Sequence, residues 1–554
     1  KATAAYLPTE TDKEYTWHIK ARYLRRNMSA VLKFGRKSEV DMTKGAIFPQ
    51  LISFALPLFL GSLFQQLYNT VDTWVVGNFV GKNSFSAVGT LASVTNLVIS
   101  FFMGFSSGAS VIISHYFGAK DSENVNRTTH TFLAVTLIMC AALTLFGLAM
   151  IPVMLSILKS PAEVAAEQRI YLSIYFGGIS GLLIYNMGSA VLRAIGDSTN
   201  PFLFLAVSAL LNTGLDLLFV IVFKMGTAGV AYATIISQMI SAILVMTVLF
   251  RTHTSVKINL KKLKIYGYIL KKILKVGLPS ALQMSITSFS NIFVQSYINY
   301  FGADVMGGWT AYIKVDQMVL LPMQSIALGT QTFVGQNLGL GQAERARRGV
   351  RISLIMSLIA TSALISLVIP LAKQIVELFI GYAENGVIFC GTMFLTYLTP
   401  AYLLPCFNQI YAGALRGSGV SGIPMGAMLF SFVFFRQIYL YLVSRFVSNT
   451  ILPIAMGYPA GWLVCSLILI IFYRIFFTDE KLKKAPLYER RNKVRRTQHD
   501  DRFVYLIVSV TGVFHTLPSL SVTTMSAFTA EPESPFATTV KEPVFDSSSP
   551  KLRE

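Results

Sequence analysis

The sequence is poor in charge and in the residue clusters that support catalysis. Only 13% of its 554 residues are Asp, Glu, Lys or Arg, whereas an average soluble domain has about 25%. Its four cysteines form no CxxC pair, and its six histidines have no partner at the spacing of metal ligands. Walker A, HExxH and GxSxG motifs do not occur. We therefore expect no disulfide framework, no structural metal, no cofactor and no enzymatic activity.

Apolar residues dominate instead. They make up 53% of the chain, and the mean hydropathy is +0.57. A membrane-spanning helix needs about 20 apolar residues, and residues 48 to 477 divide into twelve such stretches. The sequence predicts an all-α multi-pass membrane protein, embedded in the lipid bilayer, with spans near 50–76, 85–116, 128–155, 165–192, 201–223, 228–250, 276–301, 308–335, 350–372, 387–413, 424–446 and 452–476.

The net charge of +20 follows the edges of these spans, so we expect no nucleic-acid partner. The loops after even-numbered spans hold sixteen Lys and Arg residues, Arg193 and Arg416 included, and the other loops hold six. Basic loops stay in the cytoplasm. This asymmetry predicts a cell-membrane protein, plasma or inner, with both termini cytoplasmic.

The chain contains an internal repeat. Leu-Arg-x-x-Gly-x-x-x-x-Pro begins at Leu192 and again at Leu415, and Leu-Pro occurs at Leu56 and at Leu278, offsets of 223 and 222. Each unit has six spans, so both lie in the same orientation as a parallel repeat, with a cavity between two lobes. The predicted domains are a polar basic N-terminal segment 1–46, an N-lobe 47–250, a cytoplasmic linker 251–275, a C-lobe 276–477 and a basic, then disordered, tail 478–554.

Ionisable residues inside spans are functional candidates, because a charge at mid-bilayer costs about 2.5–3.5 kcal/mol. Asp72 shares one helix face with Gln65 and Asn69, and Tyr68 precedes it by one turn. Asp216 has Asn212 one turn before it, and Thr234 lies one turn into the next span. Carboxylates, an amide and a hydroxyl supply oxygen ligands for sodium or a relay for protons. The alternative is that each Asp is a hydrogen-bond anchor between helices.

The second half differs in charge. Arg436 corresponds to Thr213 at the repeat offset, so ion chemistry should be confined to the first half. Arg436 could instead bond to carbonyls of a neighbouring helix. Gln283 and Asn291 could line a cavity or join helices. Asp316 is open to both a cavity role and a role at the membrane surface.

Three stretches resemble the multidrug and toxic compound extrusion (MATE) family: Phe54–Thr73, Leu192–Pro201 and Phe333–Gly339. The resemblance covers about residues 45 to 477. It implies a twelve-helix, two-lobe antiporter that exports amphipathic, often cationic, organic compounds in exchange for protons or sodium. The lack of acids in spans 7 and 10 favours the DinF-like branch over the NorM-like branch.

The sequence offers two sets of candidate site residues, one for cation coupling and one for substrate binding. The family's cation-coupling positions match Asp72, Asn212, Asp216 and Thr234, and a sodium ion, if used, would bind there. Tyr68, Gln65 and Asn186 match further family positions. The predicted substrate-binding residues are Gln65, Tyr68, Asn69, Asn186, Gln283, Asn291 and Arg436.

One alternative function shares this architecture, a lipid-linked saccharide flippase. Its cavity should be strongly basic to hold pyrophosphate, whereas Arg436 is the one clear base among the cavity candidates, so the antiporter is favoured. We expect a monomer. The sequence does not name the cargo, choose between protons and sodium, or assign a role to residues 1–46 and 500–554.

Overall fold

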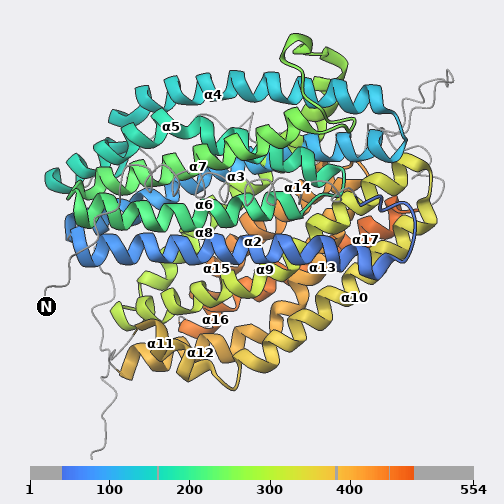
Figure 1. Cartoon of the computed structure of the whole chain (residues 1–554). Helices are drawn as coiled ribbons and strands as arrows, with labels where there is room; N and C mark the ends of the chain where they lie inside the picture. Colours follow the sequence, from blue (N-terminus) through green and yellow to red (C-terminus); the bar gives the residue numbers. More distant parts are fainter. Residues whose placement is uncertain (1–39, 81, 159–160, 381–384, 448–449, 479–554) are drawn as a thin grey trace, which may run out of the picture. The chain divides into compact units, whose positions relative to one another are not determined.

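The computed structural model describes residues 40–80, 82–158, 161–380, 385–447 and 450–478, and every regular element in that part of the chain is helical (Figure 1). Most of the predicted N-terminal segment and almost all of the predicted tail lie outside the described residues. The first half contains α2 (Ile47–Val75), η2 (Val76–Val80), α3 (Lys82–Gly118), α4 (Ser122–Leu158), α5 (Ala162–Ala194), α6 (Thr199–Leu217), η3 (Leu218–Val222) and α7 (Gly226–Arg251).

A short helical turn, η4 (Leu260–Lys262), lies in the linker between the halves. The second half contains α8 (Gly267–Asn299), α9 (Ala303–Leu340), α10 (Ala343–Val368), α11 (Ala372–Ile380), α12 (Asn385–Leu398), η5 (Thr399–Tyr402), α13 (Leu403–Gly417), α14 (Gly422–Leu429), η6 (Phe430–Phe435), α15 (Arg436–Leu442), η7 (Val443–Val447), α16 (Ile451–Ala455) and α17 (Gly457–Phe476).

Ten helices of the described part are long and apolar enough to cross a membrane, and they match ten of the twelve predicted spans. The seventh and eighth predicted spans correspond to α8 and α9, which have 33 and 38 residues but are not among those ten. These two helices carry the amides of Gln283 and Asn291 and the charge of Asp316. Large apolar side chains such as Leu145 and Phe146 face outward, 71% and 62% exposed, as lipid contact requires.

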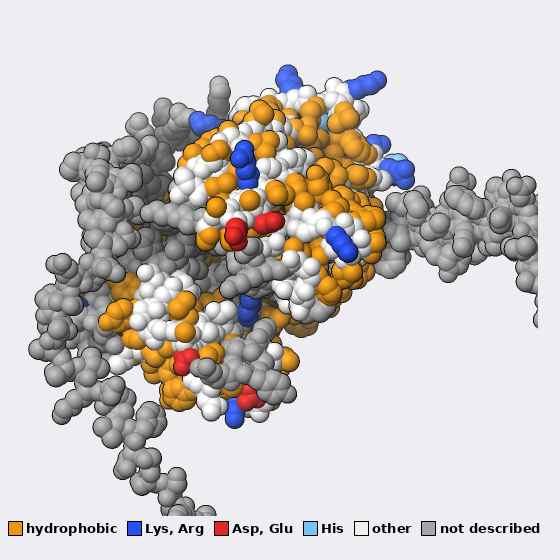
Figure 2. Space-filling view, turned by 90° about the vertical axis from the view of Figure 1, so that its left-hand side faces the viewer, with side chains coloured by type: hydrophobic (Ala, Val, Ile, Leu, Met, Phe, Trp, Pro, Cys, Tyr) orange, Lys and Arg blue, Asp and Glu red, His pale blue; other side chains and the backbone are white. Residues whose placement is uncertain are grey.

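The halves pack as two lobes around separate buried clusters. One cluster extends from Leu91 to Ala281, and the other takes almost all its residues from Val294 to Phe477. Helix α2 lies between the lobes, where it contacts α6 of the first and α9 of the second (Figure 1). Charged side chains are isolated among apolar and uncharged ones in the view of Figure 2. The predicted two-lobe, all-α membrane fold is thus confirmed.

Two local features differ from the sequence prediction. Helix α8 begins at Gly267, so the end of the predicted linker is helical, because Ile269 and Ile273 pack into the first cluster. The region after the ninth predicted span, expected to be a loop, contains α11. Val376 of α11 is buried in the second cluster, which explains why this short segment is helical.

The lobes meet closely at the end of the bundle that carries the linker, which we call the linker end. Gly104 and Gly108 of α3 form a GxxxG pair, and a Cβ on Gly108 would overlap Gly277 of α8. Farther along α3, a Cβ on Gly118 would overlap the backbone of Gln336 in α9. Small residues allow this approach, because van der Waals contact rather than hydrophobic burial joins helices in lipid.

Residues 40–46, which we call the N-terminal strap, lie across this contact. Met42 is fully buried, and its N–H donates to Gln336 Oε1 at 3.1 Å. Arg345 Nη1 donates to Gly45 O at 2.8 Å and Nη2 to Met42 O at 3.2 Å. Lys120 of the first lobe donates to Asp41 Oδ2 at 2.8 Å. The strap therefore bonds to both lobes.

Asp41 is outside the spans, and its carboxyl is charged at neutral pH. Partial burial raises its pKa, but the bonds from Lys120 and Thr43 outweigh this effect and lower the pKa below its usual value. The small stabilisation is therefore present at neutral pH and is lost as the pH falls through the acidic range. The pair is about half exposed, so the bonds of Arg345 hold the strap more firmly.

Replacement of Gly108 by Ala should destabilise the protein by about 1–3 kcal/mol, because the new methyl group has no space against α8. Gly177 of α5 is the matched control, since a Cβ there meets nothing within 4 Å. Thermal unfolding in detergent should show a lower midpoint for Gly108→Ala and an unchanged or higher one for Gly177→Ala. Equal midpoints would contradict the close contact of α3 with α8.

Arg345→Ala should release the strap, because its three charge-assisted bonds to Met42 O and Gly45 O are lost, together worth about 1–3 kcal/mol. Arg348→Ala is the control, since Arg348 on the same helix forms an exposed ion pair with Glu344. Limited proteolysis should cut residues 40–46 faster in Arg345→Ala than in the control. Unchanged cleavage in both would show that the strap is held by other contacts.

Candidate functional site

A cavity of about 540 Å³ lies between the lobes and is lined by side chains of both. Eight of the predicted site residues line it: Gln65, Tyr68, Asn186, Asn212, Thr234, Gln283, Asn291 and Arg436. Asp72 and Asp216 lie outside its lining, and Asn69 is exposed and does not line it either. The cavity and the pair of acids are therefore adjacent but distinct parts of the site.

Asp72 and Asp216 lie against each other. The carboxyl group of each lies close enough to influence the charge of the other, and Asp216 is fully buried. Among the described residues no donor reaches Asp72 Oδ1 or either oxygen of Asp216, and the amide of Asn212 is also buried without a partner. Two neighbouring carboxylates that are shielded from water repel each other unless a proton or a cation lies between them. The oxygen atoms present thus fit a proton or a sodium ion.

The helices change geometry beside this pair. Asp72 precedes the π-helical turn Val76–Val80, and Asp216 precedes the π-helical turn Leu218–Val222. The two turns contact each other, and their residues Val76 and Val220 share one buried cluster. Such turns are frequent at functional sites, because they alter the register of a helix without breaking it. Thr234 donates its hydroxyl to Val230 O at 3.0 Å, so its oxygen can still accept.

Arg436 is held by side chains of α8 rather than by the carbonyls that the sequence suggested. Its Nη2 donates to Ser290 Oγ at 2.8 Å and to Asn291 Oδ1 at 2.9 Å. Its guanidinium lies 4.8 Å from the ring centre of Tyr458. Asn291 therefore positions Arg436 as well as lining the cavity.

Asp316 lines the cavity and is 9% exposed, whereas Lys314 is exposed on the same helix. Its Oδ1 accepts a hydrogen bond from Tyr402 Oη at 2.7 Å. The sequence did not decide between a cavity position and a surface position for Asp316. Its separation of two residues from Lys314 does not show which face of the helix lines the cavity.

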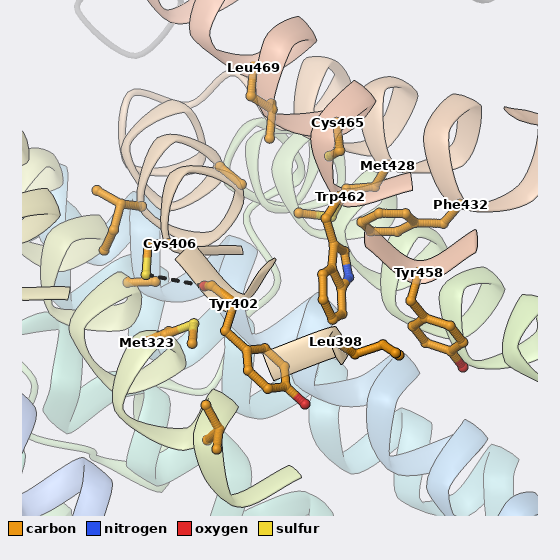
Figure 3. Close-up of a cluster of buried hydrophobic side chains, with 14 of the residues drawn as sticks. Met323, Leu398, Tyr402, Cys406, Met428, Phe432, Tyr458, Trp462, Cys465 and Leu469 are labelled. Atoms are coloured by element: carbon orange, nitrogen blue, oxygen red, sulfur yellow. Dashed lines mark hydrogen bonds between the residues drawn. The ribbon is translucent and has the colours of Figure 1, made fainter. Parts of the chain in front are cut away.

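An aromatic wall continues from Asp316 towards Arg436. Trp462 lies between Tyr402 and Tyr458 in Figure 3, with ring centres 5.4 Å and 6.0 Å away. Tyr458 in turn lies under Arg436. Sequence reasoning missed this wall, because aromatic residues on apolar helices are more often ordinary packing.

The predicted loop position is wrong for Arg193 and Arg416. They were counted as loop residues, but helices α5 and α13 continue to Ala194 and Gly417, and both arginines line the cavity. Without them the count of basic loop residues is fourteen against six, so the predicted orientation keeps its basis. Arg436 is consequently not the one clear base of the cavity.

A two-lobed bundle of apolar helices with a polar cavity between its lobes defines a multi-pass membrane transporter. Residues 57–218 and 279–442 match the MatE family, and the chain belongs to this family. The two matched regions correspond to the two halves of the internal repeat.

Relatives with assigned names agree with this membership. The chain is 27% identical to the probable multidrug resistance protein YpnP of Bacillus subtilis over 434 residues, which is 78% of this chain and 96% of YpnP. It is 26% identical to the probable multidrug resistance protein YoeA of the same organism, covering 80% and 96%. The fold is that of a multidrug resistance MATE family transporter solved in an outward-facing conformation, with a TM-score of 0.75 at 22% identity, covering 81% and 99%.

Asp216→Asn should abolish the stabilisation that a coupling cation gives. A ligand at a hundred times its dissociation constant stabilises a protein by about 2.7 kcal/mol. The thermal midpoint of the wild type should rise when sodium replaces choline or when the pH is lowered within the neutral range, where Asp41 stays charged. Asp216→Asn should show neither rise. Asp304→Asn, an exposed acid on α9, should respond like the wild type. A full response in Asp216→Asn would contradict a cation site at this pair.

Proposed function

We propose that the protein is a secondary antiporter that exports amphipathic organic compounds, cationic ones among them, in exchange for protons or sodium. The observation that carries the proposal is the contact between Asp72 and Asp216 beside the cavity. Two acids without a donor among the described residues have an energetic need for a cation, and the lining residues Tyr68 and Asn212 lie within one turn of them.

The basic linker places the linker end in the cytoplasm by the positive-inside rule, with both termini on that side of the cell membrane. The structure then corresponds to a state closed towards the cytoplasm. For cargo to enter from inside, the contacts of α3 with α8 and α9 must separate, as alternating access demands. In this proposal the protein acts as a monomer and needs no cofactor. Its partners are the organic cargo, the cation and the lipid bilayer.

Helix α2 transmits cation binding to the cavity. It carries Asp72, contacts α6 and α9, and lines the cavity with Gln65 and Tyr68. A proton or sodium ion that relieves the repulsion between Asp72 and Asp216 draws α2 towards α6, and the adjoining π-helical turns absorb the change of register. The cation drives export only if it binds one conformation more tightly than the other.

A lipid-linked saccharide flippase is the second candidate, and one observation favours it. Arg193, Arg416 and Arg436 all line the cavity. The cavity is therefore more basic than the sequence alone indicated, and a basic cavity is what a flippase for pyrophosphate cargo requires. The acid pair has no role in a flippase of this kind, which is why the antiporter is the first choice.

Asp72→Asn should reduce gradient-driven efflux to background, because one carboxylate no longer binds the coupling cation. Ethidium uptake into inverted membrane vesicles, which corresponds to export from the cell, measures this effect when proton and sodium gradients are imposed separately. Asp304→Asn should transport like the wild type. If Asp72→Asn retains gradient-driven efflux, the antiport proposal fails. If folded wild type transports no dye under either gradient, the flippase becomes the better proposal.

A further inference from the structure

The charge of the cavity lining does not suit a purely cationic cargo. Four charged side chains line the cavity among the described residues, and three of them are arginines: Arg193, Arg416 and Arg436. Asp316 is the one acid among the lining residues that the structure describes. Since Asp72 and Asp216 lie outside the lining, they do not offset this positive charge where cargo binds.

Arg193 and Arg416 are equivalent positions of the internal repeat, and the structure brings both to the same depth. Each is followed by a carbonyl that bonds to α3: Ser114 Oγ donates to Ala194 O at 3.2 Å, and His115 Nε2 donates to Gly417 O at 2.8 Å. Because Ser114 and His115 are consecutive residues, their Cα atoms are about 3.8 Å apart. The backbone segments that carry the two arginines therefore meet α3 at one level, and both side chains line the same cavity.

Neither guanidinium pairs with an acid of the described part of the chain. Arg416 is 7% exposed and donates to the amide oxygens of Gln331 and Gln283 at 3.3 and 3.5 Å, which supply dipoles but no negative charge. A buried charge without a counter-charge is costly. An anionic group bound beside these arginines would offset that cost, and guanidinium groups match carboxylate and phosphate geometry.

We infer that Arg193 and Arg416 form a binding site for an anionic group, a carboxylate or a phosphate, of the organic cargo. This inference rests on the proposed transport function and adds to its cargo compounds that carry such a group on an apolar body. Tyr458 and Trp462 of the aromatic wall line the cavity together with Phe432, and these three rings offer the surface for that body (Figure 3). The cavity volume of about 540 Å³ is in the usual range for drug-sized ligands.

The test compares two dyes of opposite charge on purified protein in detergent. Carboxyfluorescein carries carboxylates and ethidium is a cation, and fluorescence anisotropy gives the Kd of each. Arg416→Gln should weaken carboxyfluorescein binding about tenfold or more, and it should leave ethidium binding unchanged or make it tighter. Arg193→Gln should act in the same direction. Arg416→Lys should restore part of the anion binding.

The control is Arg348→Gln, which removes the same charge from an exposed position on α10 and should change neither Kd. If Arg416→Gln does not fold, Arg193→Gln decides, since the side chain of Arg193 makes no bond to the residues that the structure describes. Equal weakening of both dyes would show a structural role and overturn the inference. So would a wild type that binds ethidium but not carboxyfluorescein.

A competition arm separates the two sources of the anionic group. Displacement of carboxyfluorescein by farnesyl pyrophosphate in the wild type, lost in Arg416→Gln, supports the site and identifies a lipid phosphate. Arginine-dependent dye binding that farnesyl pyrophosphate does not displace supports the site and identifies a soluble carboxylate. Arginine-dependent anion binding without gradient-driven efflux would sink the proposed antiport alone, whereas gradient-driven ethidium efflux without anion binding would sink this inference alone.

Discussion

Lipid cannot hydrogen-bond to a polar side chain, and this constraint arranges the interior of the protein. Every strongly polar residue that the spans carry must find its partner inside the bundle. Arg436 finds Ser290, Asn291 and the ring of Tyr458, and Asp316 finds Tyr402. Asp72 and Asp216 find only each other among the described residues. Neutral groups bond to the first two, whereas the acid pair has no donor among the described residues, and this difference is the basis for proposing the pair as the coupling site.

Helix α3 forms the close contact between the lobes and also bonds to the residues that follow the two repeat arginines. Its GxxxG pair allows contact with α8, and its end packs against α9. Between these two contacts, Ser114 and His115 bond to the carbonyls that follow the two repeat arginines. Separation of the lobes at the linker end must therefore break or rearrange the bonds that set the spacing of Arg193 and Arg416. In the proposed transport cycle, opening of the linker end and release of cargo from these arginines follow from the same movement.

Part of the site was predictable because the relevant signals are local. The scarcity of acids from residue 48 to 477 made Asp72 and Asp216 conspicuous, and helical periodicity put Asn212 on the face of Asp216. Arg193 and Arg416 were misplaced because a helix that ends inside the protein can continue past its apolar stretch when other helices cover it. The strap was missed for a similar reason, since Met42 is buried by Leu51, Phe54 and Phe333, residues that follow it in the sequence by very different distances.

The sequence by itself determined the membrane-embedded helices, the internal duplication and the family, because hydropathy, span length and repeated motifs are properties of neighbouring residues. The tertiary structure alone decided which polar groups meet. It placed the acid pair outside the cavity and three arginines in its lining. Such pairings join residues more than a hundred positions apart, as for Asp72 and Asp216, and they depend on how helices pack rather than on any pattern along one helix.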